Sequence, residues 1–108
     1  MKLIGFTALM GGILWCGAVA ASAELAQEKQ CVQCHKITED FAGPSFHKIA
    51  MARKNERDGL ARMVVTIRRG SNASGGPHWG TAKMPDMQER PEVSHSEART
   101  LARWILQQ

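Results

Sequence analysis

Two cysteines and a histidine stand at a spacing that predicts a specific chemistry. Cys31 and Cys34 are three residues apart and His35 follows directly, in the order Cys-x-x-Cys-His. Two thiols one helical turn apart can each add to one vinyl group at the same edge of a porphyrin, and the adjoining imidazole can then reach its iron. The pattern therefore predicts a haem attached through Cys31 and Cys34, with His35 as an iron ligand.

Two other uses of the cysteine pair were weighed against haem attachment. A thioredoxin-like redox site shares the Cys-x-x-Cys spacing but needs a βαβ unit, which the hydrophobic pattern of this chain does not indicate. A zinc site needs four ligands, and only His47, His78 and His95 remain to complete it, none at ligand spacing from another. Haem attachment uses the whole motif and is the preferred interpretation.

An iron held by one histidine takes a sixth ligand or keeps an open position. The methionines that follow the motif are Met51, Met63, Met84 and Met87. We prefer Met84, because it lies in a long loop and is followed by Pro85, whereas Met63 falls on the apolar stripe of an expected helix. Met87 is a close competitor, and His78 would give a bis-histidine iron. A histidine and a methionine form an axial pair that suits electron transfer.

The first 23 residues predict an export signal. Lys2 is followed by an uncharged run of 21 residues that ends in Ala20-Ala21-Ser22-Ala23, the form of a secretory signal peptide. We place cleavage after Ala23, which leaves residues 24–108 as the domain and predicts a periplasmic protein. An uncleaved membrane anchor is the alternative, because the run is long enough to span a bilayer. Two nearby thiols do not stay idle in an oxidising compartment, which agrees with their use in attachment.

Four segments of the remaining chain predict helices. Residues 24–33 are rich in helix formers, and residues 44–53 begin with Pro44, which suits a first helical position. The third runs from Asp58 to Gly70, and its apolar residues recur at helical spacing. The last begins with the capping-box pattern Ser94-His95-Ser96-Glu97. No segment alternates with the period of a strand, so the fold class is all-α.

A loop of 23 residues, from Ser71 to Val93, separates the third and fourth helices. So long an irregular segment is unusual in a small domain unless it has a function, and covering one face of a cofactor is such a function. The net charge is +4 and falls to +3 when Lys2 leaves with the signal, from 13 Lys and Arg against 10 Asp and Glu. This excess is too small to indicate nucleic-acid binding, but it suits weak docking on an acidic partner.

Several further landmarks follow the first motif in a fixed order. They are Gly43-Pro44, Arg69-Gly70-Ser71, Trp79-Gly80, Lys83-Met84-Pro85 and Leu101-Ala102-Arg103-Trp104-Ile105-Leu106. In this order they resemble the small bacterial class I monohaem cytochromes c of the cytochrome c-551 kind, over nearly all of residues 24–108. The resemblance implies the cytochrome c fold, a small helical domain wrapped around one covalently bound haem.

The resemblance also implies roles for two further residues. The family's proline at the position of Pro44 lends its carbonyl to the proximal imidazole, and the tryptophan at the position of Trp79 reaches a haem propionate through its indole N–H. A plain helix start and a plain core aromatic are the alternatives. Thr66 stands where a propionate-binding arginine is expected, which leaves Arg68, Arg69 or no arginine for that carboxylate.

The chain departs from the family at three other places. Ala26 stands where relatives often have an aromatic residue, which puts the usual contact of the first and last helices in doubt. Gln30 stands where they have a glycine before the first cysteine. The ligand loop carries about four extra residues around Gln88 to Glu92, a difference that bears on partner choice.

These features predict a periplasmic electron carrier rather than an enzyme, because two protein ligands leave the iron no open position. We expect transfer between a periplasmic dehydrogenase and the respiratory chain or a terminal oxidase, as a monomer or in transient complexes, without nucleic acid or membrane partners. Lys29, Lys36 and Lys83 are the residues expected to steer an acidic partner. The alternatives are a dedicated subunit of one sulfite- or alcohol-oxidising dehydrogenase and, from another class, a haem sensor or peroxidase with a labile Met84.

Overall fold

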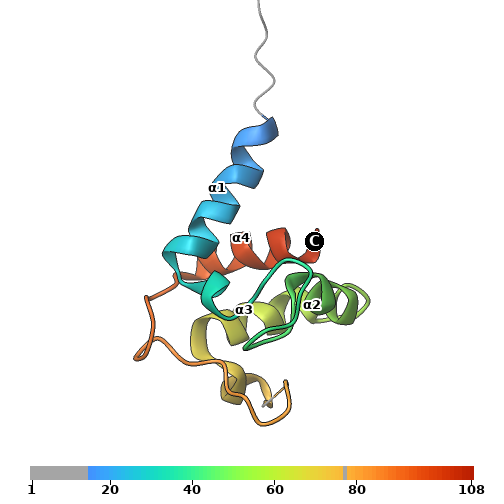
Figure 1. Ribbon diagram of the computed structural model, residues 1–108, viewed down its shortest axis with the longest axis vertical. Coiled ribbons are helices and arrows are strands. Elements are labelled where there is room, and N and C mark those ends of the chain that lie inside the picture. The colour runs from blue at the N-terminus through green and yellow to red at the C-terminus, as the bar shows by residue number, and fades with distance from the viewer. Residues whose placement is uncertain (1–14, 77) are drawn as a thin grey trace, which may run out of the picture.

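The described part of the computed structural model, residues 15–76 and 78–108, is helical (Figure 1). Its elements are α1 (Trp15–Glu28), η1 (Cys31–Gln33), α2 (Phe46–Arg53), α3 (Gly59–Arg69), η2 (Ser71–Ser74) and α4 (His95–Leu106), of which η1 and η2 are short 3-10 turns. Within these residues, extended pairing is limited to one isolated bridge between Trp79 and Ala82. The all-α prediction is confirmed.

Helix α4 organises the core, because α1, α2 and α3 all pack against it. Leu101 is fully buried, and the Trp104 ring meets the Phe46 ring edge-on with centroids 5.3 Å apart. Ala26 of α1 is also fully buried in this core. The contact of the first and last helices is therefore present despite the small residue at position 26. Lys29 reinforces it, since its Nζ donates to the Glu92 carbonyl at 2.8 Å and lies 3.4 Å from Glu97 Oε2.

Helix α1 runs without a break through Ala23, the expected cleavage position. From Ser22 onward the helix belongs to the packed domain, because Ser22 and Ala26 are buried and Leu25 packs against the core. Residues 1–14 of the expected signal lie outside the described residues, so cleavage after Ala23 stays a prediction. Across 15–76 and 78–108, none of the helices combines the length and apolar character needed to cross a membrane.

The prediction of one helix over residues 24–33 is wrong at its end. α1 stops at Glu28, and Gln30 adopts a left-handed backbone conformation with φ 63° before η1 begins. This conformation is uncommon for a residue with a Cβ, since the Cβ crowds a neighbouring carbonyl oxygen. The reversal at Gln30 lets the chain turn away from α1 and present both cysteines on a separate turn.

We expect Gln30→Gly to stabilise the protein. Glycine escapes a clash worth ~1–2 kcal/mol and loses ~0.5–1 kcal/mol through its greater freedom when unfolded, which leaves a gain of up to about 1 kcal/mol. The matched change Gln27→Gly, on the exposed face of α1, should lower the free energy of unfolding by about 1 kcal/mol. Guanidinium titrations followed by circular dichroism distinguish the two, and an equal loss in both would contradict strain at Gln30.

Caps set the start of two helices. Ser45 Oγ accepts the Lys48 N–H at 3.0 Å, so α2 begins at Phe46 and Pro44 lies before the cap. The prediction that Pro44 takes the first helical position is therefore wrong. The capping box of α4 is confirmed, because Ser94 Oγ accepts the Glu97 N–H at 3.1 Å and Glu97 Oε1 accepts the Ser94 N–H at 2.9 Å.

Candidate functional site

A cavity of about 350 Å³ opens between the helices and the long loop. Its lining is mostly apolar and includes Phe46, Ile49, Met63, Ile67, Leu101 and Ile105. All six residues singled out from the sequence also line it, namely Cys31, Cys34, His35, Pro44, Trp79 and Met84. They come from η1, from the segment before α2 and from the loop before α4, so the fold gathers distant parts of the sequence around a single space.

The ring of His35 is held in a defined orientation. Its Nδ1 lies 2.7 Å from the Pro44 carbonyl oxygen, and its ring stacks on Phe46 with centroids 5.4 Å apart. Because a carbonyl oxygen can only accept, Nδ1 carries the proton and Nε2 has a free lone pair in the neutral ring. Burial lowers the pKa of His35, which favours that neutral form, although the Pro44 contact partly offsets the effect. The imidazole is therefore prepared to act as a metal ligand through Nε2.

Gly43 gives the ring its space. A Cβ at this position would lie 2.8 Å from His35 Cε1 and 3.1 Å from Nδ1. Contacts this short are not tolerated between nonbonded carbon atoms. The glycine of the Gly43-Pro44 landmark is thus required by the imidazole beside it.

The two thiols lie on one short turn at the cavity. The backbone N–H groups of Cys34 and His35 both donate to the Cys31 carbonyl, at 3.2 and 3.0 Å. Cys31 is half-buried and Cys34 exposed, and neither is in a disulfide. Burial raises the pKa of the Cys31 thiol. Both cysteines line the same cavity, as addition to one porphyrin edge requires.

Met84 is attached to the end of α3 through Ser71. The Met84 N–H donates to Ser71 Oγ at 3.0 Å, and the Ser71 N–H donates to the Met84 carbonyl at 3.2 Å. Gly70 has φ 83°, and a Cβ there would lie 2.5 Å from the Met84 carbonyl oxygen. The Met84 backbone therefore lies directly against Gly70, and its half-buried side chain lines the cavity.

The other candidates for the second iron ligand differ in their position relative to the cavity. Met51 is exposed, and Met87 is not among the described residues that line the cavity. Met63 lines it from within the buried core. His78 also lines it, with an exposed side chain whose Nε2 lies 3.2 Å from Ser74 Oγ.

The two rival readings of the cysteine pair lack structural support. Residues 15–76 and 78–108 contain no group of three or more His, Cys, Asp and Glu side chains placed to hold a metal ion, as a zinc site would need. The same residues form no strand, so they provide no βαβ unit for a thioredoxin-like site.

Comparison with known proteins agrees with this geometry. The family model for cytochrome c matches residues 19–108. The chain belongs to the cytochrome c family. It is 37% identical over 83 residues to cytochrome c-551 of Pseudomonas denitrificans, covering 77% of this chain and 92% of the relative. It is 34% identical over 99 residues to cytochrome c-551 of Pseudomonas aeruginosa, covering 91% and 88%. The crystal structure of wild-type Nitrosomonas europaea cytochrome c552 superposes with a TM-score of 0.68 at 30% identity, covering 79% of this chain and 96% of that one.

As a cytochrome c, the chain carries one c-type haem attached through Cys31 and Cys34. The residues present fit this group. The cavity is apolar, both thiols reach it, and the imidazole beside them keeps Nε2 unprotonated. A thioether, which suits haem iron, lines the same space.

Two residues of this cytochrome c were not identified from the sequence as part of the site. Arg90, within the extra residues of the loop, donates from Nε to the Pro85 carbonyl at 2.7 Å and from Nη2 to the Ile67 carbonyl. It therefore ties the Met84 loop to α3. Arg53 lines the cavity from the end of α2. Neither could be recognised from a motif, because both contacts depend on the path of the chain between helices.

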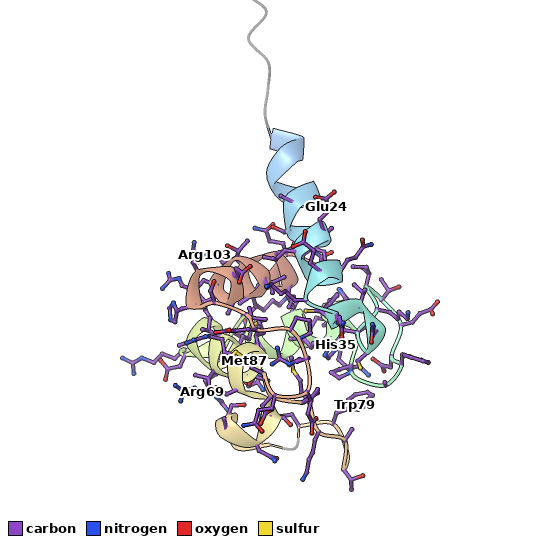
Figure 2. All side chains as sticks on the ribbon, turned by 90° about the vertical axis from the view of Figure 1, so that its left-hand side faces the viewer. Glu24, His35, Arg69, Trp79, Met87 and Arg103 are labelled. Atoms are coloured by element: carbon purple, nitrogen blue, oxygen red, sulfur yellow. The ribbon has the colours of Figure 1, made fainter. Side chains whose placement is uncertain are left out.

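The structure does not favour Arg68 or Arg69 as the group that faces a propionate. Neither is among the described residues that line the cavity. Arg68 Nε donates to the Val93 carbonyl at 3.3 Å, and Arg69 lies at the opposite side of the domain from Trp79 (Figure 2). Helical spacing explains this, because positions 63, 66 and 67 share the face of α3 toward the cavity and positions 68 and 69 do not.

Proposed function

We propose that this cytochrome c carries single electrons in the periplasm, with His35 and Met84 as the two axial ligands of its iron. The observation that carries the proposal is the convergence of an unprotonated imidazole nitrogen and a thioether on one apolar cavity beside two thiols. When bound, the haem supplies a ferric/ferrous couple. Side chains that occupy both axial positions leave no position for a substrate, which supports transfer of electrons rather than catalysis.

The surrounding residues support this ligand pair in different ways. Pro44 accepts the Nδ1 proton of His35 and so fixes the ring and its tautomer. Ser71 and Arg90 hold the backbone on either side of Met84. The apolar lining disfavours the extra positive charge of the oxidised state, and a thioether ligand acts in the same direction. Trp79, half-buried at the cavity, would donate its indole N–H to a propionate.

Arg90 gives a test of how firmly the ligand loop must be held. We expect Arg90→Gln to lower the free energy of unfolding by about 2 kcal/mol, because hydrogen bonds from a charged, part-buried donor are lost. It should also weaken the far-red absorption band that ferric haem shows with a sulfur ligand. The control Arg103→Gln, exposed on α4, should change stability by less than about 0.5 kcal/mol and leave the band intact. Equal effects of the two changes would exclude a special role for Arg90.

The partners we propose are redox proteins, a periplasmic dehydrogenase as donor and an oxidase or other acceptor. Ile37 and Phe41, which follow Cys34 in the sequence, are exposed apolar side chains, and Lys36 Nζ lies 5.4 Å from the Phe41 ring centroid. Exposed apolar side chains beside a lysine suit a small transient interface with an acidic protein. Lys83 is exposed as well, but Lys29 is engaged by Glu92 and Glu97 and contributes less to steering than expected.

Protein purified from periplasm tests the proposal. We expect a red protein whose mass equals residues 24–108 plus one haem, with the far-red band in its ferric form and slow binding of carbon monoxide. A colourless product would overturn haem attachment. Rapid carbon monoxide binding without the band would instead favour the sensor or peroxidase alternative. Co-purification with one dehydrogenase would favour a dedicated subunit over a free carrier.

A further inference from the structure

Arg53 is a mostly buried cation with unused hydrogen-bond donors at the cavity. Its side chain is 18% exposed and lines the cavity from the last turn of α2. Its Nη1 donates to both oxygens of Glu56, at 3.1 and 2.8 Å. Among the described residues, no partner is found for its Nε and Nη2. These two N–H groups point in parallel along one edge of a guanidinium, the arrangement that binds a carboxylate through both oxygens.

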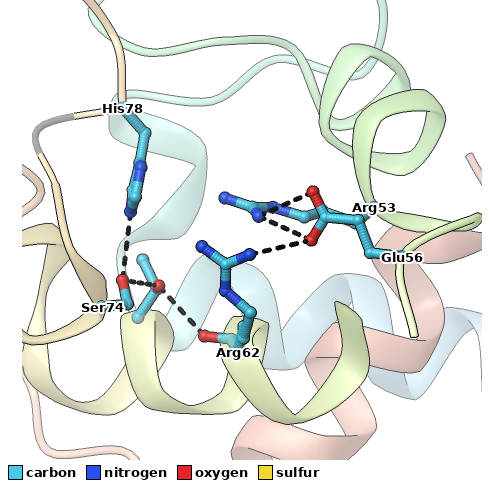
Figure 3. Close-up of polar contacts among 6 residues, drawn as sticks. Arg53, Glu56, Arg62, Ser74 and His78 are labelled. Carbon is cyan, nitrogen blue, oxygen red and sulfur yellow. Dashed lines mark hydrogen bonds and ion pairs between the residues drawn. The ribbon is translucent and has the colours of Figure 1, made fainter. Parts of the chain in front are cut away.

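Glu56 holds this guanidinium in place. Figure 3 shows its carboxylate bonded to the guanidinium groups of both Arg53 and Arg62, and Arg62 Nη1 lies 3.4 Å from Glu56 Oε2. The hydrogen bond from Arg53 is the largest of the effects that lower the pKa of Glu56, so the carboxylate stays charged. Two guanidinium groups share this one carboxylate, which leaves a net positive charge beside the cavity.

The turn between α2 and α3 fixes Glu56 relative to Arg53. The Glu56 N–H donates to the Arg53 carbonyl at 3.1 Å, and the Gly59 N–H donates to the Glu56 carbonyl at 3.2 Å. A Cβ at Gly59 would lie 2.3 Å from the Arg53 carbonyl oxygen, so the chain passes closer there than any other residue allows. The Arg53–Glu56 pair is thus built into the backbone path.

Apart from Cys31 and Cys34, which attach the haem, the other titratable groups on the cavity are already engaged or open to solvent. His35 is bonded to Pro44 and Lys48 to Asp40, while His78 lies near Ser74 Oγ and Lys83 is exposed. Lys48 Nζ also lies 4.9 Å from the Trp79 ring centroid. Thr66, on the same face of α3, bonds to Ser74 and to the Arg62 carbonyl. Among the described residues that line the cavity, Arg53 is the one arginine, and it keeps two paired donors free.

We infer that Arg53 binds a propionate carboxylate of the haem in place of a residue at position 66, and that Glu56 is the positioning residue for its guanidinium. The inference rests on the proposed function only through the presence of the covalent haem. Attachment at Cys31 and Cys34 fixes the vinyl edge, and the propionates belong to the edge away from it. Arg53 on α2 then supplies the positive charge for the propionate that Thr66 on α3 lacks.

The test uses holoprotein made with δ-aminolevulinic acid carrying carbon-13 at the carboxyl carbon, so that both propionate carboxyls are visible by NMR. In the ferrous protein we expect one carboxyl to titrate at lower pH than the other. Arg53→Gln should move that titration up by about one pH unit or more, the effect of removing an adjacent cation. Arg57→Gln, exposed on the same turn, is the control and should move neither carboxyl by a measurable amount.

Two further variants keep the test decisive if Arg53→Gln folds poorly. Arg53→Lys retains the charge but not the parallel donors, so we expect a smaller upward shift. Thr66→Arg added to Arg53→Gln should restore the low titration, because position 66 lines the same cavity. If the protein is still red and the carboxyl titration is unchanged in Arg53→Gln or Arg53→Lys, the inference is wrong. A protein without labelled haem signals would instead count against the proposed function.

Discussion

Replacing Met84 with leucine should abolish the far-red band of the ferric protein and lower its reduction potential by ~0.1 V or more, a fraction of the roughly 0.8 V that axial ligands span. The thioether stabilises the ferrous iron, and leucine supplies shape without a sulfur ligand. The open position should then bind carbon monoxide rapidly. Optical spectra and a redox titration measure all three effects.

The other methionines provide the matched controls for this result. Met87→Leu, in the same loop but away from the cavity lining, should leave the band and the potential unchanged. Met63→Leu conserves volume in the buried core and should keep the band, with a loss of less than about 1.5 kcal/mol in stability. If the band survives in Met84→Leu and disappears in either control, the ligand assignment is wrong.

Local patterns predicted the local features of this molecule well. The capping box placed the start of α4, and the apolar stripe of Leu60, Met63, Val64 and Ile67 predicted α3 and its buried face. The Cys-x-x-Cys-His motif predicted its chemistry because attachment depends on only five consecutive residues. In each case the determining interactions lie within about one or two helical turns, so the sequence contains them directly.

Several features set by contacts between distant segments were not predicted. The left-handed backbone of Gln30 could not be predicted from its residue type, because a glycine indicates such a reversal of the chain and a glutamine does not. Pro44 suited a helix start in isolation, but Ser45 supplied the cap and left the Pro44 carbonyl free for His35. Arg53 and Arg90 acquire their roles only from the paths of the α2–α3 turn and the long loop.

The choice between Arg68, Arg69 and Arg53 illustrates the same limit. The sequence left Arg68, Arg69 or no arginine as the substitute for a cation at position 66. On a helix, however, the next two residues point about 100° and 200° away, so Arg68 and Arg69 leave the cavity face after Ile67. The cation at the cavity comes instead from α2, thirteen residues before Thr66.

Gly70→Ala should damage both stability and methionine ligation, because two separate penalties fall at one position. The backbone conformation, φ 83° and ψ 172°, is nearly restricted to glycine and costs a residue with a Cβ ~1–3 kcal/mol. The Cβ would also lie 2.5 Å from the Met84 carbonyl oxygen and 3.1 Å from the Pro85 carbonyl carbon. We expect a total loss of about 3 kcal/mol or more, at the upper end of the effects of single substitutions, together with a weakened far-red band.

Gly75 provides the control. Its φ of 86° is also positive, but its ψ of 15° places it in the left-handed helical region, and a Cβ there would meet nothing within 4 Å. Gly75→Ala should therefore lose only the ~1–2 kcal/mol of backbone strain and keep the band. The difference between the two variants measures the contact between the end of α3 and the ligand loop together with the greater backbone strain at Gly70. Equal losses, with the band intact in both, would mean that Gly70 does not hold Met84 at the cavity, and the ligand would have to be positioned by Ser71 and Arg90 alone.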